Sequence, residues 1–188
     1  MRRAAIACSA LTLMACGSPQ SKRMQEVEST VRREQAPDKL VERGKLFAKM
    51  GDHTRAEQYF ASALEQGADP RTVLPMLMRS YVESARFRSA VSVGERFLVR
   101  NPKDHALRFL VATMHSAIGQ NDRAKEHLQR VVRESDGHAD AHYALAVLLR
   151  DVEQDHLGAD QHFRRYLELL PEGPHAAEAR DSLLKALP

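Results

Sequence analysis

The sequence predicts an all-α fold, an α-solenoid of stacked helical hairpins closed by a C-terminal capping helix. Three alanines, Ala56, Ala90 and Ala124, are spaced 34 residues apart, and the same order of small and large apolar side chains surrounds each one. A fixed period of this length indicates paired helices repeated along the chain. Within each period the apolar residues recur at intervals of three and four, which is the spacing of one helix face.

Each period divides into two helical segments separated by a short break. The first segment has four columns of equivalent residues: Leu40, Leu74 and Arg108; Arg43, Leu77 and Val111; Gly44, Met78 and Ala112; and Phe47, Tyr81 and His115. Gly51, Ala85 and Gly119 align in the break. The second segment then runs Ala56–Phe60–Ala63–Leu64, Ala90–Gly94–Phe97–Leu98 and Ala124–Leu128–Val131–Val132. The alanines mark the closest approach of two paired helices, and large aromatics such as Phe60, Phe97 and Phe163 are expected to fill the gaps between hairpins.

A fourth unit continues the pattern with one extra residue in its internal turn. Leu145 and Ala146 keep the phase of the first helix, whereas Ala159 and Phe163 follow one residue late. Pro174 suits the first turn of another helix because its φ is fixed. Residues 175–187 therefore predict a final helix that covers the exposed end of the stack.

With these columns in place, the chain resembles tetratricopeptide repeats over roughly residues 37–188. The repeat units are expected at about 37–70, 71–104, 105–138 and 139–173, with the cap at 174–188. Gly94 and Arg108 depart from the family pattern, because their positions usually hold bulkier or apolar residues. Pro75 predicts that its helix begins no earlier than about Arg71. The alternative to this family is an irregular α-helical bundle.

The first 15 residues have the layout of an export signal. Two arginines precede an uncharged, mostly apolar run that is too short for a permanent transmembrane helix. Residues 13–17, Leu-Met-Ala-Cys-Gly, resemble a bacterial lipobox. The resemblance implies cleavage before Cys16 and covalent lipid on its thiol. The alternatives are an ordinary secretory signal with an incidental cysteine, and a cytosolic protein with an apolar start.

A lipidated Cys16 sets further expectations for the N-terminal region. Cleavage leaves Cys16 as the single cysteine, and a thioether forms no disulfide, so we expect a fold without disulfide bonds. Residues 16–36 are polar and are expected to be the lipidated N-terminus and a tether that spans about 25 Å as a flexible chain. Met24, Val27 and Val31 would allow a loose helix there. Because Gly17 is not Asp, the lipoprotein resemblance favours the outer membrane, with the domain facing the periplasm.

Composition and motifs argue against nucleic-acid binding and catalysis. Removing residues 1–15 takes away two arginines and no acidic residue, so the formal charge falls from +3 to about +1. A nearly neutral domain lacks the field that draws a protein onto phosphates. The sequence has no His-Glu-x-x-His, no phosphate-binding Gly-rich loop and no Gly-x-Ser-x-Gly motif. We therefore predict no enzyme, no catalytic residues and no cofactor other than the lipid on Cys16.

The tetratricopeptide resemblance also implies a binding surface. In that family the first helices of successive units line a concave groove that binds extended peptides or helices of a protein partner. The register places eight candidate partner-binding residues there: Lys45, Lys49, Arg79, Glu83, Phe109, Thr113, Tyr143 and Arg150. Their mixture of cations and aromatic rings suits a peptide with carboxylates and one or two bulky side chains. The alternative is that they are merely solvated residues on helix faces.

Nine histidines raise an alternative function, an envelope enzyme or a metal-dependent protein with a histidine cluster. His138 and His142 are four residues apart, Asp136 and Asp140 lie beside them, and His162 follows. On one helix this spacing would bring two imidazoles together. However, His138 follows Gly137 in an expected turn, and no further ligand has a fixed spacing. The sequence therefore predicts no metal site, and a scaffold remains the preferred function.

Overall fold

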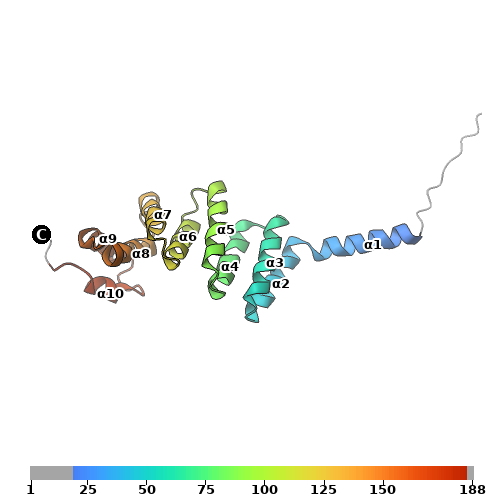
Figure 1. Ribbon diagram of the computed structural model, residues 1–188, viewed down its shortest axis with the longest axis horizontal. Coiled ribbons are helices and arrows are strands. Elements are labelled where there is room, and N and C mark those ends of the chain that lie inside the picture. The colour runs from blue at the N-terminus through green and yellow to red at the C-terminus, as the bar shows by residue number, and fades with distance from the viewer. Residues whose placement is uncertain (1–18, 186–188) are drawn as a thin grey trace, which may run out of the picture.

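The computed structural model describes residues 19–185, and no strand occurs among them. The helices are α1 (Pro19–Glu34), α2 (Pro37–Lys49), α3 (His53–Glu65), α4 (Pro70–Glu83), α5 (Phe87–Arg100), α6 (His105–Ala117), α7 (Asn121–Glu134), α8 (Ala139–Leu148), the π-helix η1 (Leu149–Glu153), α9 (His156–Leu169) and α10 (Ala176–Asp181). Helices α2 to α9 form four hairpins that follow one another in chain order along the long axis (Figure 1). The predicted all-α stack of helical hairpins is confirmed.

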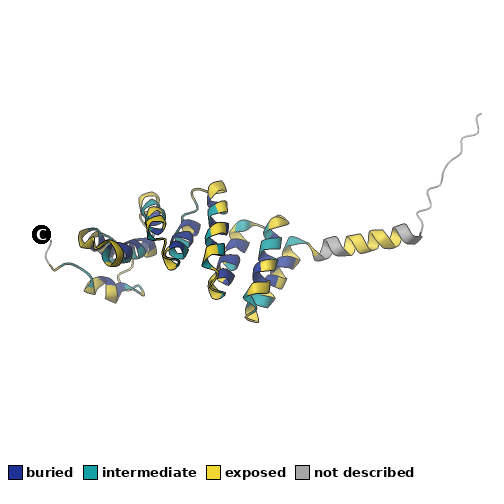
Figure 2. Ribbon diagram, viewed as in Figure 1, coloured by how far each residue is buried: buried dark blue, intermediate teal, exposed yellow. Residues whose placement is uncertain are grey.

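The core lies between the helices of the stack, where the repeated small residues are enclosed. Ala56, Ala90 and Ala124 are each 0% exposed, and Ala159 is 2% exposed. The buried faces of the hairpin helices point toward their neighbours, and the exposed faces point outward (Figure 2). Phe60 and Phe163 are buried as predicted, whereas Phe97 is only partly buried.

Side-chain caps fix where several of these helices begin. Asp52, Asp69, Asp104 and Asp155 each precede a helix, and their carboxylates accept backbone N–H bonds of 2.9–3.0 Å from Arg55, Arg71, Leu107 and Gly158. Such caps satisfy backbone donors that have no partner within the helix. Because Asp69 caps α4, this helix starts at Pro70, one residue before the predicted limit, and Pro75 lies inside it.

The internal turns of the first three hairpins share one backbone conformation. Gly51 and Gly119 have φ values of 78° and 75°, and Ala85, at the equivalent position, has a φ of 55°. The left-handed region is easy for glycine and costly for alanine. The hairpin geometry therefore imposes a conformation on Ala85 that its side chain disfavours.

The extra residue of the fourth unit is taken up by a change of helix type. Helix α8 continues into the π-helix η1, which ends at Gln154 in the left-handed conformation with a φ of 58°. The Gln154 and Asp155 N–H groups both donate to the carbonyl oxygen of Leu149. A π turn contains more residues than an α turn, so the insertion leaves the packing of α9 on α8 intact.

Residues 19–34 form the continuous helix α1, which projects from the stack (Figure 1). A helix is one of the two expectations for this region, and a flexible tether is the other. Met24 and Val27 on it are 71% and 57% exposed, so this apolar stripe does not pack against the first hairpin. Residues 20–34 contain neither Gly nor Pro, and helix formation meets no break there.

The C-terminal cap is present but its helix is shorter than the predicted 175–187. Helix α10 ends at Asp181, and the chain then turns so that the Leu184 N–H donates to Asp160 Oδ1 at 2.8 Å. Asp160 lies on α9, and its side chain is 1% exposed. Tertiary contact with this buried carboxylate is what ends the helix early.

The predicted signal, residues 1–15, and the lipidation site Cys16 lie outside the described residues. Among the residues that are described, every helix is too short or too polar to cross a lipid bilayer.

The glycine at position 94, which departs from the repeat pattern, leads to a first prediction. A methyl group at Gly94 would overlap the side chain of Val111 on α6, whereas one at Gly137 would meet no atom within 4 Å. We expect Gly94→Ala to destabilise the protein by about 1–3 kcal/mol through overpacking. The control Gly137→Ala should be neutral or stabilising by about 0.4–1 kcal/mol. Urea denaturation measures both, and equal stabilities of the two variants would contradict this packing.

Asp160 leads to a second prediction. Arg164 donates to both carboxylate oxygens, at 2.7 and 3.2 Å, and this interaction holds the pKa of Asp160 below its usual value despite the opposing effect of burial. Asp160→Asn should lower the free energy of unfolding by about 1–3 kcal/mol at pH 7. Because the folded-state pKa is depressed, the contribution of the carboxylate is complete above about pH 4 and is lost as the pH falls from there through the lower folded-state pKa. The stability difference between wild type and variant should therefore shrink in acid, while the exposed Asp181→Asn should show no such difference.

Candidate functional site

Three of the predicted binding residues line one hollow between the first two hairpins. Lys45 and Lys49 come from α2, and Arg79 comes from α4. The hollow has a volume of about 280 Å³, and Ala48, His53, Phe60, Met76 and Ser80 complete its lining. We call these eight residues the basic pocket. It combines an apolar floor with three cationic side chains, as an acidic peptide with a bulky side chain would require.

The cations of the basic pocket have weak partners within the chain. Lys45 Nζ lies 2.8 Å from Glu42, and Arg79 Nε lies 3.8 Å from the predicted groove residue Glu83. These side chains are 47–82% exposed. Exposed ion pairs contribute only about 0–1 kcal/mol. A carboxylate of a binding partner can therefore replace Glu42 or Glu83 at little cost in free energy.

A second hollow of about 160 Å³ lies between α4 and α6, the first helices of the second and third hairpins. It is lined by Pro70, Arg71, Leu74, Pro75, Asp104, Ala106, Leu107 and Leu110. Both hollows therefore lie between first helices of successive hairpins, which are the helices expected to line the concave groove.

The side chains of the other predicted groove residues contact residues of the chain itself. The ring of Phe109 is partly buried and lies 4.8 Å from that of His138, and the Thr113 hydroxyl donates to the Leu110 carbonyl at 2.8 Å. Neither residue lines the two hollows between α2, α4 and α6. The structure therefore does not bring them together with Lys45, Lys49 and Arg79.

Tyr143 and Arg150 are held by the C-terminal cap. The Tyr143 ring stacks on His175 at 4.0 Å, and its hydroxyl donates to Glu178 at 2.5 Å. Burial, reinforced by Glu178, raises the pKa of Tyr143 to about 12. Arg150 donates to Ser182 and Glu178 at 2.6 and 3.0 Å. The fourth hairpin thus presents these side chains to α10, and a partner would have to displace the cap to reach them.

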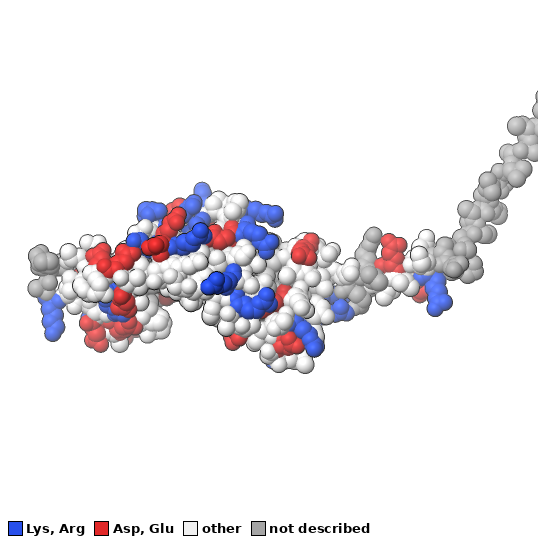
Figure 3. All heavy atoms as spheres, viewed as in Figure 1, with Lys and Arg blue, Asp and Glu red and all other residues white. Residues whose placement is uncertain are grey.

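A wider hollow, which the sequence did not predict, lies where the second and third hairpins meet. Its volume is about 830 Å³, and cationic and acidic residues alternate around it: Asp69, Arg71, Arg100, Lys103 and Asp104. Leu74, Phe97 and Leu107 form its apolar part. Over the face seen in Figure 3, acidic and basic groups are similarly interspersed. The surface in view therefore carries local charge contrasts and no uniform basic stripe.

The histidines singled out by sequence spacing do not form one group. His142 and His162 do meet, with their Nδ1 atoms 2.9 Å apart, and His142 Nε2 lies 3.1 Å from the Asp136 carbonyl oxygen. Burial lowers the pKa of both imidazoles. His138 instead caps α8 by accepting the Ala141 N–H. His138 is thus separate from the His142–His162 pair, and these histidines do not form a group of three metal-binding atoms among the residues that the structure describes.

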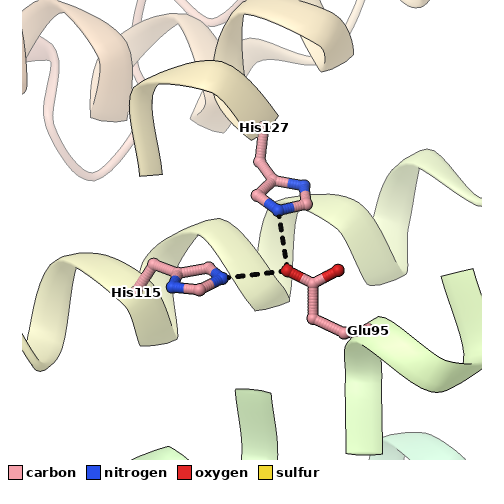
Figure 4. A group of neighbouring side chains, drawn as sticks. All are labelled: Glu95, His115 and His127. Carbon is pink, nitrogen blue, oxygen red and sulfur yellow. Dashed lines mark hydrogen bonds and ion pairs between the residues drawn. The ribbon is translucent and has the colours of Figure 1, made fainter. Parts of the chain in front are cut away.

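A different group of three does converge, and it was missed from the sequence. Glu95, His115 and His127 come from α5, α6 and α7, and Figure 4 shows both imidazoles directed at the Glu95 carboxylate. His115 Nε2 and His127 Nε2 each lie 3.1 Å from Glu95 Oε1. Burial alone would raise the pKa of Glu95, but the bonds and charges of the two histidines hold it below its usual value. Burial lowers the pKa of His127.

The sequence separation explains why this group was missed. Its members are 20 and 12 residues apart, which no helical spacing connects. The available signal was His115 itself, which occupies a column otherwise filled by Phe47 and Tyr81.

The arrangement of α2 to α9 defines the class of protein: an all-helical array of hairpin repeats that presents grooves between its helices. Comparison with known proteins agrees with this class. Residues 112–177 match the tetratricopeptide repeat family, so this part of the chain carries the family's sequence pattern and the preceding hairpins share its architecture. The described chain is thus an all-helical, TPR-like array of helical hairpins, and residues 112–177 carry the tetratricopeptide repeat sequence pattern.

Several solved structures have a similar fold. YrrB, a TPR protein with an unusual peptide-binding site, is 20% identical with a TM-score of 0.66, over 85% of this chain and 86% of that one. A tetratricopeptide repeat protein from Parabacteroides merdae is 20% identical with a TM-score of 0.70, over 79% of this chain and 59% of that one. MamA from Desulfovibrio magneticus RS-1 is 21% identical with a TM-score of 0.65, over 84% and 89%.

One curated relative is similar in sequence. Protein O-mannosyl-transferase TMTC1 from Homo sapiens is 24% identical over 135 residues, which are 72% of this chain and 15% of that protein. The chain therefore spans only a small part of this relative.

Proposed function

We propose that this protein is a lipid-anchored, non-catalytic scaffold that binds a protein partner in the groove formed by α2, α4 and α6. The observation that carries this proposal is the basic pocket between α2 and α4, which is followed by a second hollow between α4 and α6. Two hollows in succession suit an extended segment that places a side chain in each. YrrB, which has a similar fold, is described as having a peptide-binding site, and this supports a peptide ligand.

The charge of the basic pocket defines the partner further. Lys45, Lys49 and Arg79 surround a lining that includes Phe60 and Met76. A segment with acidic residues next to one bulky apolar side chain matches this lining. The partner's carboxylates replace Glu42 and Glu83 as ion-pair partners of Lys45 and Arg79.

The proposed anchor is lipid on Cys16, which the lipobox-like residues 13–17 support. Three acyl chains hold a protein firmly at a membrane, because each buried CH₂ contributes roughly 0.8 kcal/mol. With Gly17 after the cysteine, the scaffold belongs at the outer membrane and faces the periplasm. Its resemblance to repeat lipoproteins favours a role in assembling envelope, secretion or pilus complexes.

The groove is tested by reversing its charge. In the Lys45→Glu, Arg79→Glu double variant, repulsion should abolish partner binding while the thermal melt stays unchanged, because both side chains are on the surface. A photo-crosslinking residue at Met76, inside the basic pocket, reports binding in intact cells and allows the partner to be identified. The control Arg88→Glu, Arg123→Glu reverses two exposed cations on the second helices α5 and α7. Identical crosslinks from Met76 in both double variants would show that Lys45 and Arg79 do not bind the partner, and loss of crosslinks in both would show no selective role for this pocket.

The anchor is tested by removing its thiol. Cys16→Ser should move the protein from the membrane fraction to the soluble fraction, because no lipid can be attached. Density-gradient separation of the wild-type membranes then distinguishes the outer from the inner membrane. Persistent membrane association of Cys16→Ser would refute the lipid anchor without bearing on the groove.

A further inference from the structure

The convergence of Glu95, His115 and His127 is built by the stacking of two hairpins. Glu95 belongs to the second helix of the second hairpin, and the two histidines belong to the two helices of the third. The three donor atoms all lie within 4.8 Å of one another. His115 is fully buried, whereas the Glu95 side chain is 35% exposed and the His127 side chain 13%. The group is therefore anchored in the core through His115 and partly exposed to solvent at Glu95 and His127.

We propose that Glu95, His115 and His127 bind a zinc ion that joins α5 to α6 and α7. Two imidazole nitrogens and one carboxylate oxygen are the donor set of zinc sites that keep a fourth position for water. In a tetrahedral site with zinc bonds of about 2.0–2.1 Å, two donor atoms lie about 3.4 Å apart. Each histidine nitrogen is already 3.1 Å from Glu95 Oε1, and all three atoms lie within 4.8 Å of one another, so small rotations of the side chains bring them to one ion. The hard ions Mg²⁺ and Ca²⁺ prefer oxygen ligands and are excluded by the two nitrogens.

A hydrogen bond between His115 and Gln120 orients the His115 ring as a metal ligand. Its Nδ1 lies 2.7 Å from Gln120 Oε1, an acceptor, so Nδ1 carries the proton and donates. The lone pair of a neutral His115 then lies on Nε2 and faces the Glu95 oxygen. A cation between the two atoms is then needed to join them: a proton on Nε2 supplies the hydrogen bond to Glu95, and a zinc ion would take the place of that proton. A hydrogen bond to the far ring nitrogen is also the usual way in which proteins hold a zinc-binding histidine.

Arg108 opposes zinc binding from the side of His127. Its Nη1 lies 3.4 Å from His127 Nδ1, and a guanidinium can only donate, so Nδ1 accepts. Zinc on Nε2 would leave the proton on Nδ1, and two donors would then face each other. The Arg108 Nε is also buried without a hydrogen-bond partner among residues 19–185. We therefore expect Arg108 to weaken the site, and its removal to strengthen it.

The repeat itself supplies the substitution that tests this effect. Leu40 and Leu74 occupy the column of Arg108 in the first two hairpins, and both are buried there. Arg108→Leu therefore introduces a side chain that this position accommodates elsewhere in the same stack. It removes both the positive charge and the competing donor next to His127.

The experiment titrates Zn²⁺ into the purified full chain, which is prepared without a histidine tag and freed of metal by a chelator. Isothermal titration calorimetry should give one zinc ion per chain, and Mg²⁺ should give no heat. Glu95→Gln and His127→Ala should weaken binding at least about 10-fold, and Gln120→Ala about 10–100-fold through loss of orientation. Arg108→Leu should tighten binding.

The matched control is His142→Ala, which removes one member of the other histidine pair and should leave zinc affinity unchanged. His115→Ala creates a cavity in the core, so the partly exposed Glu95 and His127 carry the test if that variant does not fold. The absence of stoichiometric zinc binding would overturn the proposal, and so would binding that survives both Glu95→Gln and His127→Ala. None of these outcomes depends on the partner groove.

Discussion

The close approach of paired helices at the alanine column is the constraint on which the rest of the structure depends. Ala56, Ala90, Ala124 and Ala159 are almost completely enclosed. Because an alanine side chain is a single methyl group, the two helices of a hairpin can approach each other closely at this position. Phe60 is enclosed against Gly44 of its own hairpin and Phe163 against Tyr143, and at the second hairpin Gly94 leaves room for Val111 of the third. The two hollows, lined by α2 with α4 and by α4 with α6, lie between the first helices of successive hairpins.

A column that is apolar in the first half of the stack becomes polar in the second half. The column of Leu40 and Leu74 continues with Arg108 and His142. The facing position, three residues after each alanine, changes in parallel from Tyr59 and Val93 to His127 and His162. The polar members pair with each other, Arg108 with His127 and His142 with His162, so the same repeat contact is made in both halves with different chemistry. The Glu95 cluster forms because His127, which pairs with Arg108, also contacts Glu95 of the preceding hairpin.

The two ends of the stack explain how the groove is divided. At the C-terminal end, α10 covers the fourth hairpin and engages Tyr143 and Arg150 through Glu178. At the N-terminal end, Lys45, Lys49 and Arg79 remain on an accessible hollow. The eight residues expected in one continuous groove are therefore separated. Three line the basic pocket, Glu83 pairs with one of them, Arg79, and two contact the cap, while Phe109 and Thr113 contact other residues of the stack.

The sequence alone determined the helical period, the hairpins and the buried alanines, because these depend on local spacing that recurs in every unit. It also located Lys45, Lys49 and Arg79 near one another, since equivalent positions of adjacent repeats become neighbours. Only the tertiary structure decided the early end of α10, the π turn after α8 and the meeting of Glu95 with two histidines. The end of α10 and the Glu95 cluster depend on contacts between residues 24 and 32 positions apart, Leu184 with Asp160 and His127 with Glu95, and the π turn keeps α9 packed on α8. Packing between helices, which no single segment encodes, supplies that information.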